Sequence, residues 1–439
     1  MTAPIAFREA LAFWFKLGCI SFGGPAGQIA LMHQELVERR RWISEGRFVQ
    51  ALNYCMVLPG PEAQQLATYL GWLMHRTWGG IAAGALFVLP SLLLILGLGW
   101  IYMAYGHLAW VAGVLAGIKP AVVALVAQAA YRLGQRTLRH AWHWSLATGA
   151  FVALAGFDVA FPWVIATAAL VGIGLNRWQP GAWARASHGA GQTDTSHPPA
   201  LIDDHTPAPA HAHFSWRRLG IVLCCGLTLA LLPWAALVAG WGREDALPQM
   251  AQFFTQAALL TFGGAYAVLP YVVQGAVETH GWVSAAQMMD GLALGESTPG
   301  PLIMVVAFVG YVGGYAQAWF GPDTPGMAGV VAACVVTWFT FLPSFVFILA
   351  GGPLVEQTHR SPQWQAPLGA ISAAVVGVIA QLALFFAGHT LWPNGWSGGM
   401  DAFALFLTLG AAWALLRARL AVGWVLVGCG LLGVARSWV

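Results

Sequence analysis

The chain has 439 residues, of which 58% are hydrophobic and only 8% are charged, and its formal net charge is +3. Soluble domains carry about 25% charged residues, so this composition excludes a water-soluble globular protein and requires most of the outer surface to face lipid. The small positive charge gives no reason to expect a nucleic-acid partner.

In chain order, the apolar runs predict membrane-spanning helices. A helix needs roughly 20 apolar residues to cross a bilayer. Runs near that length cover residues 80–103, 108–130, 144–174 (broken near Asp158), 219–240, 327–349, 366–387, 402–416 and 420–434. Arg8, Glu9 and Lys16 interrupt the N-terminal apolar stretch, so we expect a retained helix there and no cleavable leader. The predicted fold is an all-α polytopic membrane protein with roughly 10–13 membrane-crossing segments.

The two halves of the chain repeat one pattern. Residues 13–61 align without a gap with residues 253–301. Phe22-Gly23-Gly24 matches Phe262-Gly263-Gly264, and Pro59-Gly60-Pro61 matches Pro299-Gly300-Pro301. Further on, a stretch ending in Leu89-Pro90-Ser91 resembles one ending in Leu342-Pro343-Ser344. Such self-similarity predicts two related membrane units, at 1–176 and 242–439.

A different composition separates these units. Residues 177–215 are rich in Ala, Pro, His, Ser and Asp and have no apolar period, which predicts a flexible linker. Its histidines match no known metal-site spacing. Residues 216–241 then predict one linking transmembrane helix.

The basic residues predict opposite orientations for the two units. Lys and Arg concentrate on cytoplasmic loops. The first unit carries its basic residues after its early helices, whereas the matching loops of the second unit are nearly free of them. The residues concerned are Arg39, Arg40, Arg41, Arg47, Arg76, Arg132, Arg136 and Arg139 in the first unit, and Arg360, Arg417 and Arg419 on the other loops of the second. We therefore predict inverted-topology repeats, with the N-terminus and linker in the cytoplasm. Inverted repeats with a site at their interface are a recurring transporter plan.

The Phe-Gly-Gly and Pro-Gly-Pro motifs predict broken helices. Each follows a helix of roughly fifteen residues, which spans about 22 Å and falls short of the roughly 30 Å hydrocarbon core. If Arg39–Arg47 and Arg76 are both cytoplasmic, Pro59-Gly60-Pro61 is the tip of a re-entrant hairpin. The free N–H groups of a restarting helix attract anions, so four such starts predict an anion site. Its candidate residues are Phe22, Gly23, Gly24, Pro25, Gly27, Gln28, Pro59, Gly60, Pro61, Phe262, Gly263, Gly264, Pro299, Gly300 and Pro301. The alternative is that these glycines and prolines only kink helices and allow tight packing.

Charged residues inside apolar stretches are costly and often functional. Lys16 and Lys119 are candidate anchors for an oxyanion, although Lys16 also fits snorkelling toward the interface. Glu62, Asp290 and Glu296 are candidate proton carriers, with helix capping or pairing to Arg47 as the alternative for these carboxylates.

No cofactor or metal site is expected from the sequence. The six cysteines form no C-x-x-C pattern, and no G-x-G-x-x-G follows a strand. Packing of small apolar side chains inside helices is the expected role of the cysteines.

Together these motifs resemble the chromate ion transporter family in its long, two-domain form. The resemblance rests on Ser21-Phe22-Gly23-Gly24-Pro25 with Gln28, Trp42 and Pro59-Gly60-Pro61, and on the matching motifs of the second half. It implies a bacterial inner-membrane protein with antiparallel domains that exports chromate, driven by the proton-motive force. The expected partners are chromate, protons and the lipid bilayer.

Three alternatives stay open at this point. The first is a transporter of the same kind whose substrate is sulfate or another inorganic oxyanion. The second is a membrane-bound chromate reductase, for which no cofactor motif is visible, and the third is a scaffold or sensor. Transport direction, the coupling ion and a homodimer are not decided by the sequence.

Overall fold

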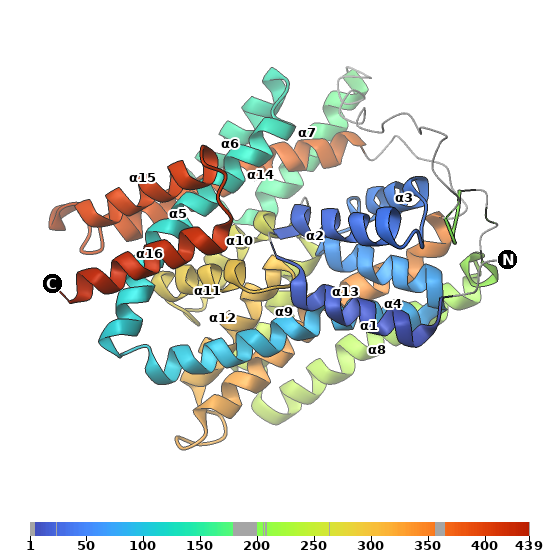
Figure 1. Cartoon of the computed structure of the whole chain (residues 1–439), viewed down its shortest axis with the longest axis horizontal. Helices are drawn as coiled ribbons and strands as arrows, with labels where there is room; N and C mark the ends of the chain where they lie inside the picture. Colours follow the sequence, from blue (N-terminus) through green and yellow to red (C-terminus); the bar gives the residue numbers. More distant parts are fainter. Residues whose placement is uncertain are drawn as a thin grey trace.

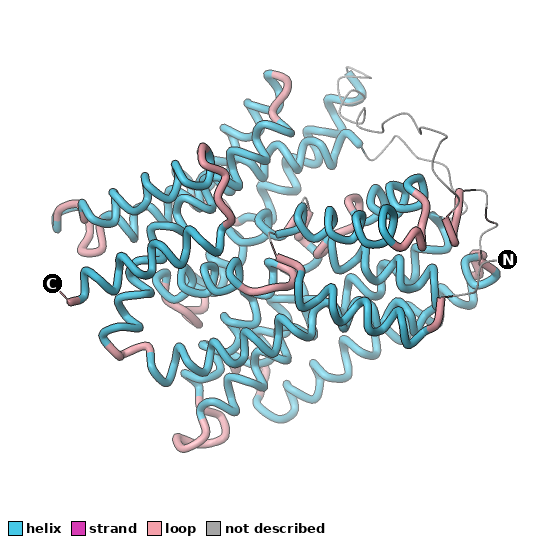
Figure 2. The backbone as a smooth tube through the Cα atoms, viewed as in Figure 1, coloured by secondary structure: helices cyan, strands magenta, loops and turns pink. Residues whose placement is uncertain are grey.

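The computed structural model describes residues 5–22, 24–178, 200–204, 206, 209–262, 264–355 and 365–438, and this part of the chain is helical (Figures 1 and 2). The α-helices are α1 (Phe7–Ile20), α2 (Gly24–His33), α3 (Glu45–Cys55), α4 (Glu62–Tyr105), α5 (Ala109–Thr137), α6 (Ala141–Phe157), α7 (Phe161–Trp178), α8 (Trp216–Trp241), α9 (Ala246–Leu259), α10 (Ala265–Val273), α11 (Ala285–Ser297), α12 (Val305–Gln317), α13 (Pro325–Val355), α14 (Gln365–Leu391), α15 (Ala402–Leu416) and α16 (Val422–Ser437). The described part also contains the short π-helices η1 (Gln34–Arg39) and η4 (Gln274–Thr279) and the 3-10 helices η3 (Ala210–Ala212), η5 (Leu302–Met304) and η7 (Trp396–Gly398). The predicted all-α class is confirmed.

Five of the described helices are long and apolar enough to cross a membrane. They are α4, α5, α8, α13 and α14, and α8 is so little covered by protein that its most apolar stretch is only 6% buried. A chain with several such helices and exposed leucines along them needs lipid around it. It is therefore a multi-pass membrane protein.

The run at residues 144–174 is broken where the sequence indicated. Helix α6 ends at Phe157, and Asp158 follows in a left-handed conformation with φ 49° before α7 begins. Asp and Asn tolerate this conformation better than most residues. The pair α6 and α7 thus replaces one long span by two shorter helices.

Helix α4 is a hairpin rather than one rod. At its bend Arg76 has φ 58° and ψ −158°, outside helical geometry. Beyond the bend the chain turns back, since a Cβ on Gly80 would come within 3.0 Å of the Trp72 side chain and one on Gly71 within 2.5 Å of Ala83. Small residues let the two arms approach closely, as they do between membrane helices.

The sequence repeat has matching local structure in both halves. Phe13 packs edge-on against Trp42 with ring centroids 5.3 Å apart, and Phe253 against Trp282 at 5.6 Å. Ser44 caps α3 and Ser284 caps α11. The π-helices η1 and η4 also fall at matching positions.

The two halves share a hydrophobic core that contains buried residues of both. Helix α5 packs against α14, α15 and α16, and α4 packs against α12 and α13. In Figure 1, α5 runs beside α15 and α16, although α5 belongs to the first half of the chain and α15 and α16 to the second. The predicted units at 1–176 and 242–439 therefore interlock along much of their length.

Part of the predicted linker is packed against the first half. The Ile202 N–H donates to the Trp42 carbonyl at 3.0 Å, and the Ile202 carbonyl accepts from the Ser44 N–H at 3.0 Å. Asp204 accepts from the Ser44 hydroxyl at 2.7 Å. Residues 200–204 thus depart from the flexible linker expected there, while residues 179–199 lie outside the described part.

Candidate functional site

The helices break at both Phe-Gly-Gly motifs. Helix α1 ends at Ile20 and α2 begins at Gly24, while α9 ends at Leu259 and α10 begins after Gly264. Gly24 has φ +70° and Gly264 has φ +100°, conformations that glycine adopts without strain. The middle glycines of the motifs, Gly23 and Gly263, lie outside the described residues.

The helices also break at both Pro-Gly-Pro tips. Gly60 and Gly300 have φ of +126° and +107°. Helix α4 begins directly after Pro61, and the 3-10 helix η5 begins directly after Pro301 and leads into α12. The four predicted breaks are therefore confirmed as chain geometry.

Each tip of one half is bonded to a break of the other half. The Gly60 N–H donates to the Thr261 carbonyl at 2.8 Å, and the Gly300 N–H donates to the Ser21 carbonyl at 2.9 Å. Thr261 and Ser21 occupy matching positions directly before the two Phe-Gly-Gly motifs, so the two bonds are reciprocal. The Gln28 side-chain amide adds a bond to the Gly300 carbonyl at 2.5 Å. We call Ser21, Gln28, Gly60, Thr261 and Gly300 the central cluster.

The glycines at the tips allow the backbone to pack closely against side chains of the other half. A Cβ added to Gly60 would overlap the Ser344 hydroxyl, and one added to Gly300 would lie 2.5 Å from the Ser91 Cβ. Each serine belongs to the half opposite its glycine. The Ser344 side chain therefore occupies the space that a side chain at position 60 would fill.

Buried polar atoms without a hydrogen-bond partner gather around the same helices. In the described part of the chain they include Gln28 Oε1, Gln64 Oε1, Gln65 Oε1 and Ser91 Oγ, all on side chains no more than 1% exposed. Leaving such an atom unpaired is costly, so each marks a place where water or a ligand is expected. Sequence reasoning missed Gln64 and Gln65, although two adjacent glutamines within four residues of Pro61 in an apolar helix were a signal.

The remaining motif residues surround the breaks. Phe22 is 53% exposed and Phe262 is partly buried. Pro25 and Gly27 are partly buried on α2, and a Cβ on Gly27 would lie 2.9 Å from the Phe22 carbonyl. The tip prolines Pro59, Pro61, Pro299 and Pro301 are buried or partly buried.

Lys119 and Asp290, predicted separately, form an ion pair. Lys119 Nζ lies 3.5 Å from Asp290 Oδ2, and the Tyr102 hydroxyl donates to the same oxygen at 3.0 Å. Asp290 lies nine residues before Pro299, so the pair is roughly 13 Å along the chain of α11 from the tip. Lys119 therefore forms a second centre rather than part of the central cluster.

The other charged candidates are dispersed. Lys16 is exposed on the outer face of α1 beside exposed Phe15, as expected for snorkelling. Glu62 is partly buried on the first turn of α4, and Glu296 accepts a hydrogen bond from the Tyr266 hydroxyl. Arg47 donates to the Thr206 carbonyl at 2.5 Å. Lys16 is thus not drawn into either centre.

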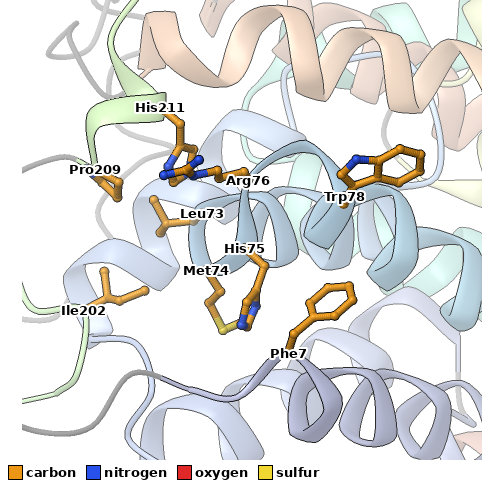
Figure 3. Close-up of a pocket in the computed structure, with 9 residues that line it drawn as sticks. All are labelled: Phe7, Leu73, Met74, His75, Arg76, Trp78, Ile202, Pro209 and His211. Atoms are coloured by element: carbon orange, nitrogen blue, oxygen red, sulfur yellow. The ribbon is translucent and has the colours of Figure 1, made fainter.

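A pocket lies beside the bend of α4 (Figure 3). Its volume is about 610 Å³, and its lining residues are Phe7, Leu73, Met74, His75, Arg76, Trp78, Ile202, Pro209 and His211. The bend is fourteen residues beyond Glu62, which is roughly 20 Å along the first arm of α4. This pocket is therefore formed where α1 and α4 meet Ile202, Pro209 and His211, apart from the central cluster.

Comparison with known proteins adds the family. The family model described as "Chromate transporter" matches residues 8–173 and 248–434, which include both pairs of breaks. The chain belongs to the chromate transporter family. No solved structure matches it.

Members of the chromate transporter family with curated names resemble the chain over most of its length. A chromate transport protein of Pseudomonas aeruginosa is 31% identical over 434 residues, covering 98% of this chain and 92% of that protein. One of Cupriavidus metallidurans is 29% identical over 395 residues, covering 89% and 85%. A probable chromate transport protein of Synechococcus elongatus is 28% identical over 377 residues, covering 85% and 83%. These relatives are named as transport proteins.

Proposed function

We propose that the chain is a secondary active transporter that exports chromate from the cytoplasm, energised by the proton-motive force, without chemically converting the anion. Membership of the chromate transporter family supports the substrate. The observation that carries the mechanism is the reciprocal pair of bonds from Gly60 to Thr261 and from Gly300 to Ser21. These bonds join the helix breaks of the two halves at one interface.

The central cluster suits an oxyanion for a physical reason. Helix α4 starts directly after Pro61 and α10 directly after Gly264, with no side chain capping either end. The first N–H groups of such helices and their dipole favour negative charge. The buried Ser91 hydroxyl is unpaired and can donate a hydrogen bond to a tetrahedral anion, and the Gln64 amide, which donates one N–H to Thr68, has a second N–H to donate.

Alternating access would use the same interface. In this proposal the two halves are inverted repeats, in the plan common to secondary transporters. The protein lies in a bacterial inner membrane, with its N-terminus and residues 177–215 in the cytoplasm. Small relative movements of the halves then expose the central cluster to one side or the other.

The test is uptake of radiolabelled chromate into everted membrane vesicles that carry the protein. Their lumen corresponds to the cell exterior, so an exporter accumulates chromate inside when respiration energises the membrane. Vesicles without the protein and vesicles with an uncoupler are the controls, and sulfate is the competitor. Saturable flux of sulfate without accumulation of chromate would keep the transporter and overturn the substrate, whereas no flux of either anion would overturn the function.

A further inference from the structure

The ion pair between Lys119 and Asp290 joins three helices from both halves. Lys119 lies on α5 and Tyr102 on α4, in the first half, and Asp290 lies on α11 in the second. Both partners reach the same carboxylate oxygen, Oδ2, at 3.5 Å and 3.0 Å. The other oxygen, Oδ1, is buried and has no hydrogen-bond partner in the described part of the chain.

The two members of the pair differ in burial. The Asp290 side chain is 2% exposed, whereas the Lys119 side chain is 26% exposed. An incoming anion can therefore reach the ammonium group while the carboxylate stays inside. A buried carboxylate that loses its cation is strongly destabilised and binds a proton instead.

Among the described residues, the surroundings offer Asp290 no second cation. Of the elements packed against α11, α5 contributes Lys119 and α4 contributes Tyr102. Helix α14 contributes Thr390, whose hydroxyl donates a hydrogen bond to the Met289 sulfur. Helix α12 contributes Phe308, whose ring meets the Tyr102 ring edge-on with the ring centroids 5.2 Å apart. On α16, Arg436 is paired with Asp401 at 3.0 Å.

We propose that, when no substrate is bound, Asp290 pairs with the Lys119 ammonium at the place that the substrate anion takes on binding. Anion binding and protonation of Asp290 then occur together. The dianion displaces the carboxylate from the ammonium, and Asp290 forms one O–H bond with a proton taken from water. Lys119 keeps its charge throughout. This inference rests on the proposed function and specifies its coupling.

The exchange sets the charge that is carried. Each dianion travels with one proton, so one net negative charge crosses the membrane in each cycle. Export is then driven by the membrane potential, which is negative inside, and is opposed by the pH gradient. The membrane potential, rather than the pH gradient, is thus the component of the proton-motive force that drives export.

Proton uptake on anion binding tests this directly. Chromate is added to the purified protein in weakly buffered, alkaline detergent solution, where the free anion carries two charges, and a pH-indicator dye reports protons. The wild type is expected to take up about one proton per anion bound. Asp290→Asn keeps the size of the side chain and is expected to bind chromate with no proton uptake. Asp401→Asn, which removes a different interhelical ion pair, is the matched control and should behave as the wild type.

A second variant separates exchange from a structural ion pair. Lys119→Met/Asp290→Asn is a neutral pair, and a structural role would leave its chromate affinity at the wild-type level. We expect the affinity to fall at least tenfold, because the anion loses its cation.

The outcomes distinguish the two proposals. Chromate binding by the wild type without proton uptake, or unchanged uptake in Asp290→Asn, overturns the exchange and leaves the transporter intact. A wild type that neither binds nor transports chromate overturns the proposed function and this inference with it.

Discussion

Gly60 and Gly300 show how single residues position the site. Both have a positive φ and both lie against a serine of the opposite half. A side chain at either position meets two costs, one from the backbone conformation and one from overlap with the serine. The tips can therefore approach the breaks of the other half only because they carry glycine.

Replacing Gly60 by Ala should lower stability by about 2 kcal/mol and abolish chromate accumulation. Thermal unfolding in detergent and vesicle uptake measure the two effects. Gly97→Ala is the matched control, because an added Cβ there meets nothing within 4 Å and Ala favours a helix. Full activity of Gly60→Ala would show that the tip does not need its close contact with Ser344.

Asp401 gives a second residue-scale prediction, in the loop before α15. It accepts hydrogen bonds from the Phe403 and Ala404 N–H groups and from Arg436. Burial raises the pKa of Asp401, but the hydrogen bonds and charge of Ala404, Arg436 and Phe403 outweigh it, so the pKa lies below its ordinary value. The stabilisation is complete above the unfolded-state pKa of about 3.9 and is lost as the pH falls through the lower folded-state pKa.

Asp401→Ala should therefore destabilise the protein by about 1 kcal/mol at neutral pH, chiefly through loss of the helix cap. The difference from the wild type should shrink as the pH falls below about 3.9. Unfolding midpoints measured over an acidic pH series check this. A difference that stays constant into strong acid would show that the Asp401 carboxylate is not its source.

Among the elements, α4 combines a strained bend with close packing of its two arms. Arg76 at the bend has φ 58° and ψ −158°, a conformation that glycine alone adopts easily. An exposed arginine kept in such a conformation lowers stability unless another contact compensates for it. The bend lies at the pocket that Ile202, Pro209 and His211 also line.

Arg76→Gly is expected to raise the free energy of unfolding by roughly 1 kcal/mol, because it relieves this strain. Arg8→Gly, on the exposed face of α1, is the control and should lower it by up to about 1 kcal/mol. Chemical denaturation of both variants measures the difference. A loss of stability in Arg76→Gly would mean that the arginine side chain makes a compensating contact.

The elements were largely predictable from the sequence, whereas their partners were not. Run lengths and the Gly and Pro motifs indicate where helices start and stop, because these depend on local chemistry. Which face of a helix meets another depends on tertiary packing. Lys16 and Lys119 both interrupt apolar stretches, but only Lys119 meets a carboxylate across the bundle. Similarly, Ser344 and Ser91, which lie opposite Gly60 and Gly300, are each far away in the sequence, so the motifs alone do not indicate these contacts.

For the whole molecule, the proposed inverted arrangement of the two halves predicts that matching positions face opposite sides of the membrane. Glu38 and Glu278 are equivalent in the repeat, and both are exposed. In a background without native cysteines, Glu278→Cys should react with a membrane-impermeant maleimide in intact spheroplasts, and Glu38→Cys only in everted vesicles. Labelling of both from the same side would exclude the inversion.

The interlocked core limits how the halves can move. Helices α4 and α5 pack against α12, α13 and α14–α16 over long stretches, and packed cores resist continuous deformation. Access is therefore expected to alternate through shifts around the breaks, where helices already end, rather than through separation of whole halves. The interlocking was not predictable from the repeat, because alignment of two segments does not report their mutual packing.

The most direct test of the account is to locate the bound anion. Crystals of the protein grown with chromate, with data collected at the chromium absorption edge, would show the metal as an anomalous peak. We predict a peak at the interface of the two halves, either between the Pro-Gly-Pro tips and the breaks at Ser21 and Thr261, or beside Lys119, where the anion replaces Asp290. A peak confined to the pocket beside Arg76, or to the outer surface, would contradict the claim that the paired helix breaks form the substrate site.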